Sequence, residues 1–262
     1  FWTWYVWLVS WICYAELWHS VLCYDIDKKK IDNLKNWKSV IYEQWLDTLL
    51  IKNIKNWRLK FSSNVKETII FWKVIFSCVW TPVDIQDWLK TDLSQVLSVA
   101  ENFWKYIDEY KILVNKSTVP VWTWNDISKI ISEEIEKRGS NIKFDIVSNP
   151  EFLREGTAID DFLNPDRIVY WTSSEESLNI MRNLYWVFKN KQVSIIETDI
   201  KTSELIKYVS NSFLAMKLSF FNEVSNLSEK LWTNINDLID WVWTDKRIWK
   251  KYIDPWIWYA WS

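Results

Sequence analysis

Phe1-Trp2-Thr3-Trp4-Tyr5-Val6-Trp7 opens the chain and carries tryptophan at positions 2, 4 and 7. Written with glycine at these positions, it becomes F-G-T-G-Y-V-G, the G-x-G-x-x-G pattern that joins a strand to a helix in dinucleotide-binding folds. Asp25 ends the next strand pattern, where a carboxylate can bind ribose hydroxyls, although an N-cap acid of the following helix would also explain it. The pattern predicts a nucleotide-binding α/β fold if tryptophan stands for glycine.

The composition supports that substitution. Of 262 residues only 2 are glycine and 23 are tryptophan, whereas glycine makes up about 7% of an ordinary protein. Turns with positive φ need glycine, because other side chains resist that conformation. We interpret most of these tryptophans as glycine, since UGA encodes tryptophan in some genetic codes and glycine in others. The positions expected in turns, some with positive φ, are Trp2, Trp37, Trp57, Trp80, Trp232 and Trp256.

Charge and cysteine content exclude several classes of protein. The 32 basic and 34 acidic residues give a net charge of −2, which argues against binding to nucleic acid. Charged residues interrupt each apolar run, so we expect no membrane span, and no signal peptide is recognisable. The chain has three cysteines, Cys13, Cys23 and Cys78, which are too few for a disulfide framework. We expect each of them to be a small apolar residue of the core. We therefore expect a cytoplasmic protein. We expect no metal site, because His, Cys and carboxylate residues never cluster at the spacing of metal ligands.

Hydrophobic patterns predict strands that alternate with helices. Strand patterns occupy 21–24, 73–79, 111–115, 144–147 and 193–196, and helical patterns occupy 5–17, 27–34, 46–54, 94–107, 127–137 and 177–188. This alternation is typical of an α/β fold, here a Rossmann-like parallel sheet with helices on both faces. A long helical pattern follows over 200–231. We expect a nucleotide-binding domain over 1–195, with a truncated first strand, and the start of an all-helical central domain over 196–262.

Polar residues follow the predicted strands, at the edge where open α/β sheets bind ligands. Thr81 lies in V-W-T-P after strand 73–79, and Thr118 lies in K-S-T-V-P after strand 111–115. The segment 149–159, N-P-E-F-L-R-E-G-T-A-I, carries Glu151 and Glu155. Taken singly, strand-ending turns and acids at a helix N-terminus would explain these residues equally well.

Two further motifs lie in the last third of the chain. Lys207 and Asn211 are one helical turn apart, so they share a face, and an amine with an amide can bind an alkoxide or position water. A surface lysine with a polar neighbour is the alternative. The chain then ends in Asp245-K-R-I-W and Tyr252-I-D-P-W-I-W-Y-A-W-S.

These motifs together resemble the nucleotide-sugar dehydrogenases of the UDP-glucose/GDP-mannose dehydrogenase family. The resemblance covers the whole chain once glycine is restored, for example in V-G-T-P, S-T-V-P-V-G-T-G and P-G-I-G-Y-A-G-S. It implies NAD as the cofactor and UDP-glucose as the substrate, oxidised twice at C6 to UDP-glucuronate. GDP-mannose or another nucleotide sugar is the alternative substrate.

The resemblance also assigns roles to residues. The positions matching cofactor contacts are Trp2, Trp4, Tyr5, Val6, Trp7, Asp25, Lys30, Thr81, Thr118 and Glu155. Those matching sugar-nucleotide contacts are Glu151, Phe152, Leu153, Arg154, Glu155, Lys207, Asn211, Arg247, Tyr252, Ile253, Asp254, Pro255, Trp256 and Trp258. Catalytic roles fall to Thr118 and Glu155, which would place water, and to Lys207 and Asn211, which would stabilise oxyanions.

The chain departs from the family in two respects. The family's nucleophilic cysteine, which forms a thiohemiacetal and then a thioester, follows directly after the position of Ser262. The family's C-terminal UDP-binding domain also follows that position, so this sequence contains neither the cysteine nor that domain. We therefore expect a fragment that is inactive as written, from a parent enzyme that forms a homodimer through helix 200–231. A non-catalytic tryptophan-rich module that binds glycans or a protein partner through aromatic side chains is the alternative from another class.

Overall fold

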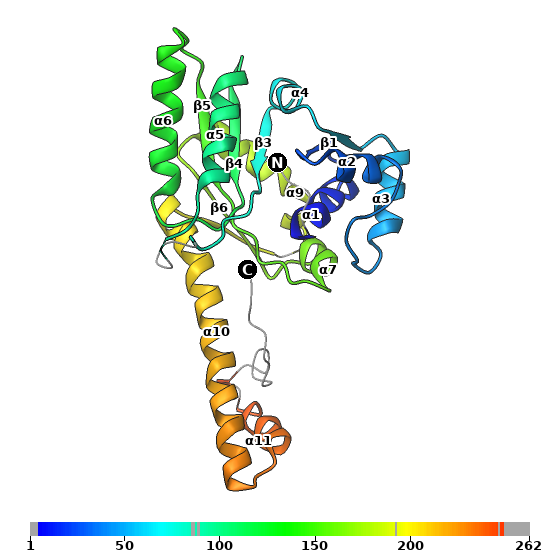
Figure 1. Cartoon of the computed structure of the whole chain (residues 1–262), viewed down its shortest axis with the longest axis vertical. Helices are drawn as coiled ribbons and strands as arrows, with labels where there is room; N and C mark the ends of the chain where they lie inside the picture. The colour runs from blue at the N-terminus through cyan, green and yellow to red at the C-terminus, as the bar shows by residue number, and fades with distance from the viewer. Residues whose placement is uncertain (1–4, 85–86, 88–89, 192, 246, 249–262) are drawn as a thin grey trace. The chain divides into compact units, whose positions relative to one another are not determined.

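The computed structural model describes the chain except for residues 1–4, 85–86, 88–89, 192, 246 and 249–262 (Figure 1). The chain divides into two compact units, Phe1–Leu205 and Ile206–Ser262. Helix α10 (Ile200–Leu231) begins in the first unit and continues into the second.

The first unit alternates helices with short strands, as the sequence predicts. Its helices before α10 are α1 (Tyr5–Glu16), α2 (Lys28–Lys35), α3 (Leu46–Lys55), α4 (Val65–Phe71), α5 (Ser94–Tyr106), α6 (Thr123–Lys137), α7 (Ala158–Leu163), α8 (Glu175–Leu184) and α9 (Trp186–Lys189). Its strands are β1 (Val21–Tyr24), β2 (Leu59–Ser62), β3 (Val74–Ser77), β4 (Lys111–Asn115), β5 (Phe144–Ser148), β6 (Arg167–Thr172) and β7 (Ser194–Glu197). This is the predicted Rossmann-like α/β fold.

The strands form a parallel pair, β1-β2, and a five-stranded sheet in the order β3-β4-β5-β6-β7. The prediction of parallel strands is wrong at one place, because β5 and β6 are antiparallel. Their contact joins Val147 to Thr172 and Ser148 to Trp171, so the carboxyl ends of both strands overlap. Strand β6 begins beyond the carboxyl end of β5 and runs back toward it. Mixed sheets are common among large α/β sheets, and antiparallel neighbours need no crossover connection between them.

Helices cover both faces of this sheet, and β4 shows why. Successive side chains of a strand point to opposite faces. Ile112 and Val114 pack in the core cluster that includes α1, α7 and α9, whereas Leu113 packs in the cluster that includes α5 and α6. Figure 1 shows α5 and α6 together on one side of β4 and β5. A strand buried on both faces explains the uninterrupted apolar run in the sequence.

Four helices end in tryptophan where glycine ordinarily stands. After α3, the Trp57 N–H donates to the Ile54 carbonyl at 3.0 Å and the Arg58 N–H donates to the Asn53 carbonyl at 3.1 Å. This pair of bonds is the Schellman motif, whose C′ residue takes a positive φ. The same two bonds close α1, α2, α6 and α10. The C′ residues of these five helices are Trp18, Trp37, Trp57, Gly139 and Trp232, with φ of 70°, 64°, 60°, 72° and 56°.

Across the described residues, every positive φ belongs to a tryptophan or a glycine. The other two tryptophans with positive φ are Trp45, at 69°, and Trp122, at 82°. They lie directly before α3 and α6. The predicted turn positions are therefore confirmed at 37, 57 and 232. Trp80 is exposed after β3, and positions 2 and 256 lie outside the described residues. The backbone thus supports the interpretation of tryptophan as glycine.

The second unit is a helical hairpin of α10 and α11 (Ile235–Val242). Phe221 of α10 and Ile239 of α11 are buried together, and Ile235, Val242 and Trp243 pack against them. No described helix, including the 32-residue α10, combines the length and apolarity that a bilayer span requires.

Candidate active site

The carboxyl ends of β3 and β4 meet through their side chains. The Thr81 hydroxyl donates to the Thr118 carbonyl at 2.7 Å, and the Ser117 hydroxyl donates to the Val79 carbonyl at 2.8 Å. Both bonds join segments about forty residues apart in sequence, because the parallel strands that precede them end at the same edge. Two of the predicted site residues, Thr81 and Thr118, therefore lie together at this edge.

A buried polar network ties the end of β4 to the end of β5. The amine of Lys116 donates to Asn149 Oδ1 at 3.1 Å, and the Tyr185 hydroxyl donates to the same oxygen at 2.6 Å. Asn149 in turn donates to the Val169 carbonyl at 2.8 Å. The Tyr14 hydroxyl lies 2.5 Å from that of Tyr185. The sequence patterns missed this network, because no local pattern pairs a residue of α1 with residues that follow β4, β5 and α8.

The loop between β5 and α7 carries the predicted substrate residues of the first unit. The Glu151 carboxylate accepts the Leu153 N–H at 2.6 Å. Arg154 donates to Asp161 through its backbone N–H at 2.9 Å and through its guanidinium at 3.0 and 2.5 Å. These bonds fold the loop on itself, and the Glu155 side chain is exposed. A carboxylate that faces solvent here is accessible to a substrate or a water molecule.

Phe152 and Leu153 of this loop contact the rest of the unit. The guanidinium of Arg167 lies over the ring of Phe152, 4.0 Å from its centroid. Leu153 packs against the core cluster under the loop. Phe152 and Leu153 thus anchor the loop to the body of the unit.

The predicted nucleotide side has a buried acid at the carboxyl end of β1. Asp25 is 1% exposed, and one of its carboxylate oxygens accepts the Asp27 N–H at 2.8 Å. Lys30 Nζ lies 4.0 Å from the other oxygen. Asp27, not Asp25, caps α2 by accepting from the N–H groups of Lys29 and Lys30, so the alternative N-cap role falls to its neighbour. A carboxylate at this place suits ribose hydroxyls.

The glycine-like positions of the first turn are only partly described. Trp2 and Trp4 lie outside the described residues, and Tyr5 and Val6 are the first two residues of α1. Trp7 is half-buried and packs against the core cluster.

The remaining predicted residues belong to the second unit. Lys207 is buried and Asn211 half-buried on α10, one turn apart. Arg247 is exposed and forms an ion pair with Asp245, with Nη2 and Oδ2 2.5 Å apart. The predicted residues at 252–256 and at 258 lie outside the described part of the chain.

Burial makes the cysteines of this chain poor nucleophiles. All three are buried and free of disulfides. Burial raises the pKa of Cys78 to about 12 and raises the pKa of the Cys13 and Cys23 thiols well above their usual range. Since the thiolate is the reactive form, none of these side chains suits covalent catalysis.

One buried acid lies beside the segment that follows Thr118. Glu204, near the start of α10, accepts the Trp122 N–H at 3.0 Å. Its other carboxylate oxygen is buried without a hydrogen-bond partner among the described residues. Burial raises the pKa of Glu204 to about 7, while the N–H groups of Trp122 and Trp124 oppose that rise. Glu204 therefore links α10 to the first turn of α6.

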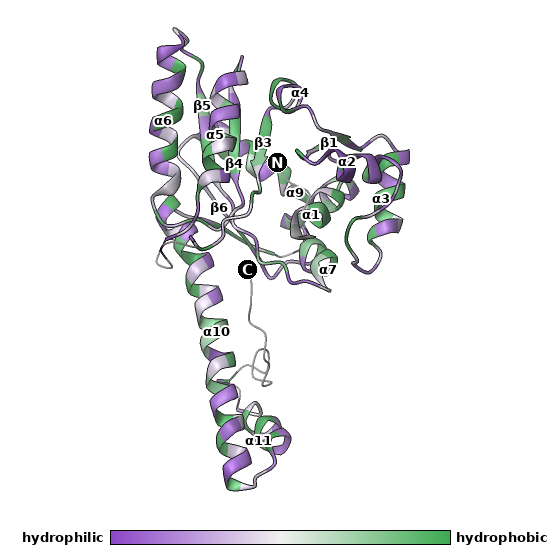
Figure 2. Ribbon diagram, in the orientation of Figure 1, coloured by the Kyte–Doolittle hydropathy of each residue, from purple (hydrophilic) through white to green (hydrophobic). Residues whose placement is uncertain are grey.

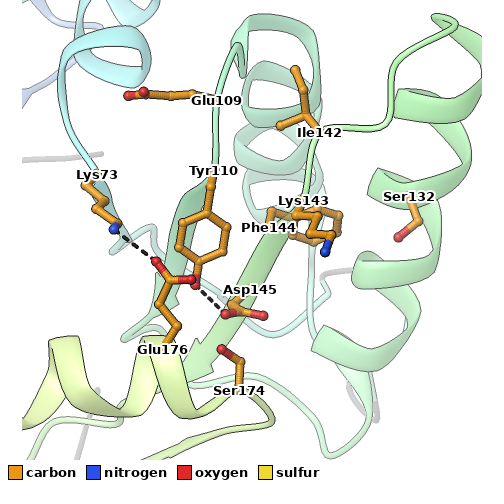
Figure 3. A pocket seen from close by; sticks show the side chains of 10 residues that line it. All are labelled: Lys73, Glu109, Tyr110, Ser132, Ile142, Lys143, Phe144, Asp145, Ser174 and Glu176. Carbon is orange, nitrogen blue, oxygen red and sulfur yellow. Dashed lines mark hydrogen bonds and ion pairs between the residues drawn. The ribbon is translucent and has the colours of Figure 1, made fainter.

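A pocket of about 760 Å³ lies at the opposite edge of the sheet (Figure 3). The Tyr110 hydroxyl donates to Asp145 at 2.5 Å, and Lys73 pairs with Glu176 at 3.1 Å across it. Burial, followed by the Asp145 carboxylate, raises the pKa of Tyr110. Its lining contains no predicted site residue, and comprises Lys73, Glu109, Tyr110, Ser132, Ile142, Lys143, Phe144, Asp145, Ser174 and Glu176.

Comparison with known proteins identifies the family. Residues 2–189 match the NAD-binding domain of the UDP-glucose/GDP-mannose dehydrogenase family, and residues 201–259 match its central domain. UDP-glucose 6-dehydrogenase TuaD of Bacillus subtilis is 38% identical over 249 residues, which are 95% of this chain and 52% of that protein. A UDP-glucose 6-dehydrogenase of Rhizobium meliloti is 39% identical over 253 residues, 95% of this chain and 56% of that protein.

Solved structures agree with these matches. A UDP-glucose dehydrogenase from the archaeon Pyrobaculum islandicum gives a TM-score of 0.87 at 32% identity, over 96% of this chain and 57% of that one. A GDP-mannose dehydrogenase from Pseudomonas aeruginosa gives 0.85 at 27% identity, over 92% of this chain and 55% of that one. This chain spans about half the length of the curated relatives it matches. It belongs to the UDP-glucose/GDP-mannose dehydrogenase family, with matches to the NAD-binding domain and to the central domain of that family.

Proposed function

We propose that the complete protein oxidises C6 of UDP-glucose to the carboxylate of UDP-glucuronate, reducing two NAD⁺ in the process. The observation that carries the proposal is the meeting of Thr81 and Thr118 at the carboxyl edge of β3 and β4. The loop with Glu151 and Glu155 follows the neighbouring strand. GDP-mannose is the second candidate substrate, because a GDP-mannose dehydrogenase resembles this chain almost as closely in structure.

The nucleotide side would hold NAD through Asp25 and Lys30. The buried Asp25 carboxylate has one oxygen fixed by a backbone N–H, which orients the group for the ribose hydroxyls. The N-terminus of α1 would face the pyrophosphate, since helix N-termini favour anions. When bound, NAD supplies the hydride acceptor.

The chain's own residues would supply orientation and charge. The Lys207 amine and the Asn211 amide would stabilise negative charge on the reacting oxygen. Thr118 and Glu155 would hold the water that hydrolyses the thioester formed on the nucleophilic cysteine of the family. The remaining proposed substrate contacts are Glu151 to Arg154, Arg247, Tyr252 to Trp256 and Trp258.

The test uses the full-length gene product with glycine at the tryptophan positions. NADH absorbance should report two NADH for each UDP-glucose, with UDP-glucose preferred over GDP-mannose. Lys207→Ala should lower kcat by roughly 100-fold or more, because it removes a charge from the transition state. Lys129→Ala, on the exposed face of α6, is the control and should leave kcat unchanged. Preference for GDP-mannose, or no turnover by the parent, would refute the proposal.

Peptide mass spectrometry of the native protein tests the tryptophan interpretation directly. We expect glycine at positions 37, 57 and 232, where the backbone has positive φ. Tryptophan in those peptides would contradict it and would favour the tryptophan-rich binding module.

A homodimer through α10 is supported by an apolar stripe on its surface. Side chains spaced three, four or seven residues apart share one helix face. On α10 the exposed apolar residues with this spacing are Leu205, Val209, Phe213, Met216, Phe220, Leu227 and Leu231. Apolar colour recurs along the length of α10 in Figure 2. Leaving such a stripe in water is unfavourable, and a second copy of the helix would cover it.

Sedimentation of the full-length protein tests the dimer. Phe213→Lys with Phe220→Lys should shift the protein toward monomer at low micromolar concentration. Ile130→Lys, an exposed apolar residue of α6, should leave the dimer intact. A dimer that survives the double substitution would contradict this interface.

We also propose a cytoplasmic location, with which the reduced, buried cysteines are consistent.

A further inference from the structure

The loop that carries Glu155 is held by an acid from a distant part of the chain. Glu43 lies between α2 and α3 and is 6% exposed. One of its carboxylate oxygens accepts the Gly156 N–H and the other accepts the Ala158 N–H, both at 3.0 Å. The two partners are 113 and 115 residues away in sequence. The carboxylate thus bridges two backbone donors of one loop.

Local groups do not supply these bonds. The residue before α7, Thr157, makes no side-chain cap to the helix. Two nearby acids bind elsewhere: Glu151 of the loop accepts from Leu153, and Asp161 of α7 accepts from Arg154. The first N–H groups of a helix lack partners within it, and leaving them unsatisfied in a buried place is costly. Glu43 therefore determines where the backbone after Glu155 is held.

The geometry at Gly156 makes this fixation important for Glu155. Gly156 has φ of +85°, so the chain turns sharply directly after Glu155. The Thr157 N–H donates to the Arg154 carbonyl at 3.2 Å and closes a turn over Glu155 and Gly156, but this bond does not use the Gly156 N–H. The bond from the Gly156 N–H to Glu43 adds a second restraint on the peptide between Glu155 and Gly156, and with it on the direction in which the Glu155 side chain leaves the loop.

We propose that Glu43 is a positioning residue for Glu155, acting through the Gly156 and Ala158 backbone without touching the substrate. The role of Glu155 rests on the proposed function. The two bonds from Glu43 to the Gly156 and Ala158 N–H groups, here called the clamp, do not depend on it. A carboxylate is required because both of its oxygens accept. Glutamine has one acceptor oxygen, and its NH₂ group would face the second N–H, so it can replace only one of the bonds.

The experiment compares Glu43→Gln with Glu43→Asp and the parent in the full-length protein. Hydrogen exchange of the Gly156 and Ala158 amides, followed by NMR, should be roughly 10- to 100-fold faster in Glu43→Gln, as expected for loss of a charge-assisted bond. Glu43→Asp keeps two acceptor oxygens and should restore part of the protection. Glu134→Gln, which removes only a surface pair with Lys137, should change neither amide.

Kinetics separate positioning from stability. Glu43→Gln should lower kcat by about 10-fold or more at a temperature where circular dichroism shows the variant to be fully folded, so the loss does not reflect unfolding. Glu43→Asp should recover part of kcat. Unchanged amide exchange in Glu43→Gln, or faster exchange with unaltered kcat, would overturn the inference. If the parent does not oxidise UDP-glucose but the exchange result holds, the proposed function fails and the clamp stands.

Discussion

Replacing Trp57 by glycine should stabilise this chain, which is the opposite of the usual effect of glycine. An L-residue in the left-handed region costs roughly 1–2 kcal/mol, and glycine does not incur that cost. Glycine loses about 0.5–1 kcal/mol more backbone entropy on folding. Trp57 is 80% exposed, so little packing is lost with its ring. The net gain should be about 1 kcal/mol, a rise in Tm of about 2–4 °C for a unit of this size.

Thermal and urea unfolding of Trp57→Gly and its parent measure this gain. Trp104→Gly is the control, because Trp104 lies within α5 with ordinary helical geometry and packs against the core. There glycine should destabilise by about 1 kcal/mol or more. A Tm that is unchanged or lower in Trp57→Gly would refute the argument from backbone strain.

Three further predictions follow from buried groups. Burial holds the folded pKa of Glu204 near 7, above its ordinary 4.5, so its contribution to stability is full below about pH 4.5 and is lost as pH rises through 7. That loss is up to about 3 kcal/mol. The urea midpoint of the unsubstituted chain should fall between pH 4.5 and 7.5, and that of Glu204→Gln should not. The same pH dependence of the midpoint in both proteins would contradict the prediction. Lys116→Met should lower the free energy of unfolding by about 1–3 kcal/mol, because Asn149 loses a buried donor; an unchanged urea midpoint would be evidence against the network. A thiol reagent such as DTNB should label no cysteine of this chain in the native protein and all three after denaturation, and rapid labelling of the native form would contradict their burial.

Much of the fold could be predicted because it depends on local pattern. The uninterrupted apolar run of β4 and the Asn-Trp pairs after α2 and α3 are read from a few neighbouring residues. The predicted helix over 177–188 is divided in the structure at Tyr185, between α8 and α9. The sequence patterns missed β2, α4, α7, β6 and α11, which are four to eight residues long. A segment of that length presents too few positions for a periodic pattern to be distinctive.

The site was predictable only where it depends on strand ends. Thr81 and Thr118 could be placed together because parallel strands share one carboxyl edge. The bonds of Glu43 to Gly156 and Ala158 could not be predicted, because backbone N–H groups leave no trace in the sequence. The same holds for Lys116, whose buried amine is indistinguishable from a surface lysine in sequence.

Some of the tryptophans show one of two physical conflicts that glycine would remove. Trp57 represents the group with positive φ, where a side chain strains the backbone. Trp124 and Trp72 represent a second group, in which the indole N–H is buried without a hydrogen-bond partner among the described residues. A buried tryptophan ordinarily finds a partner for this group, since an unsatisfied donor costs about 1–3 kcal/mol. Glycine at 57 removes the strain, and glycine at 124 or 72 removes the orphaned donor. One substitution thus resolves two unrelated physical conflicts, which a protein shaped around tryptophan would have no reason to contain together.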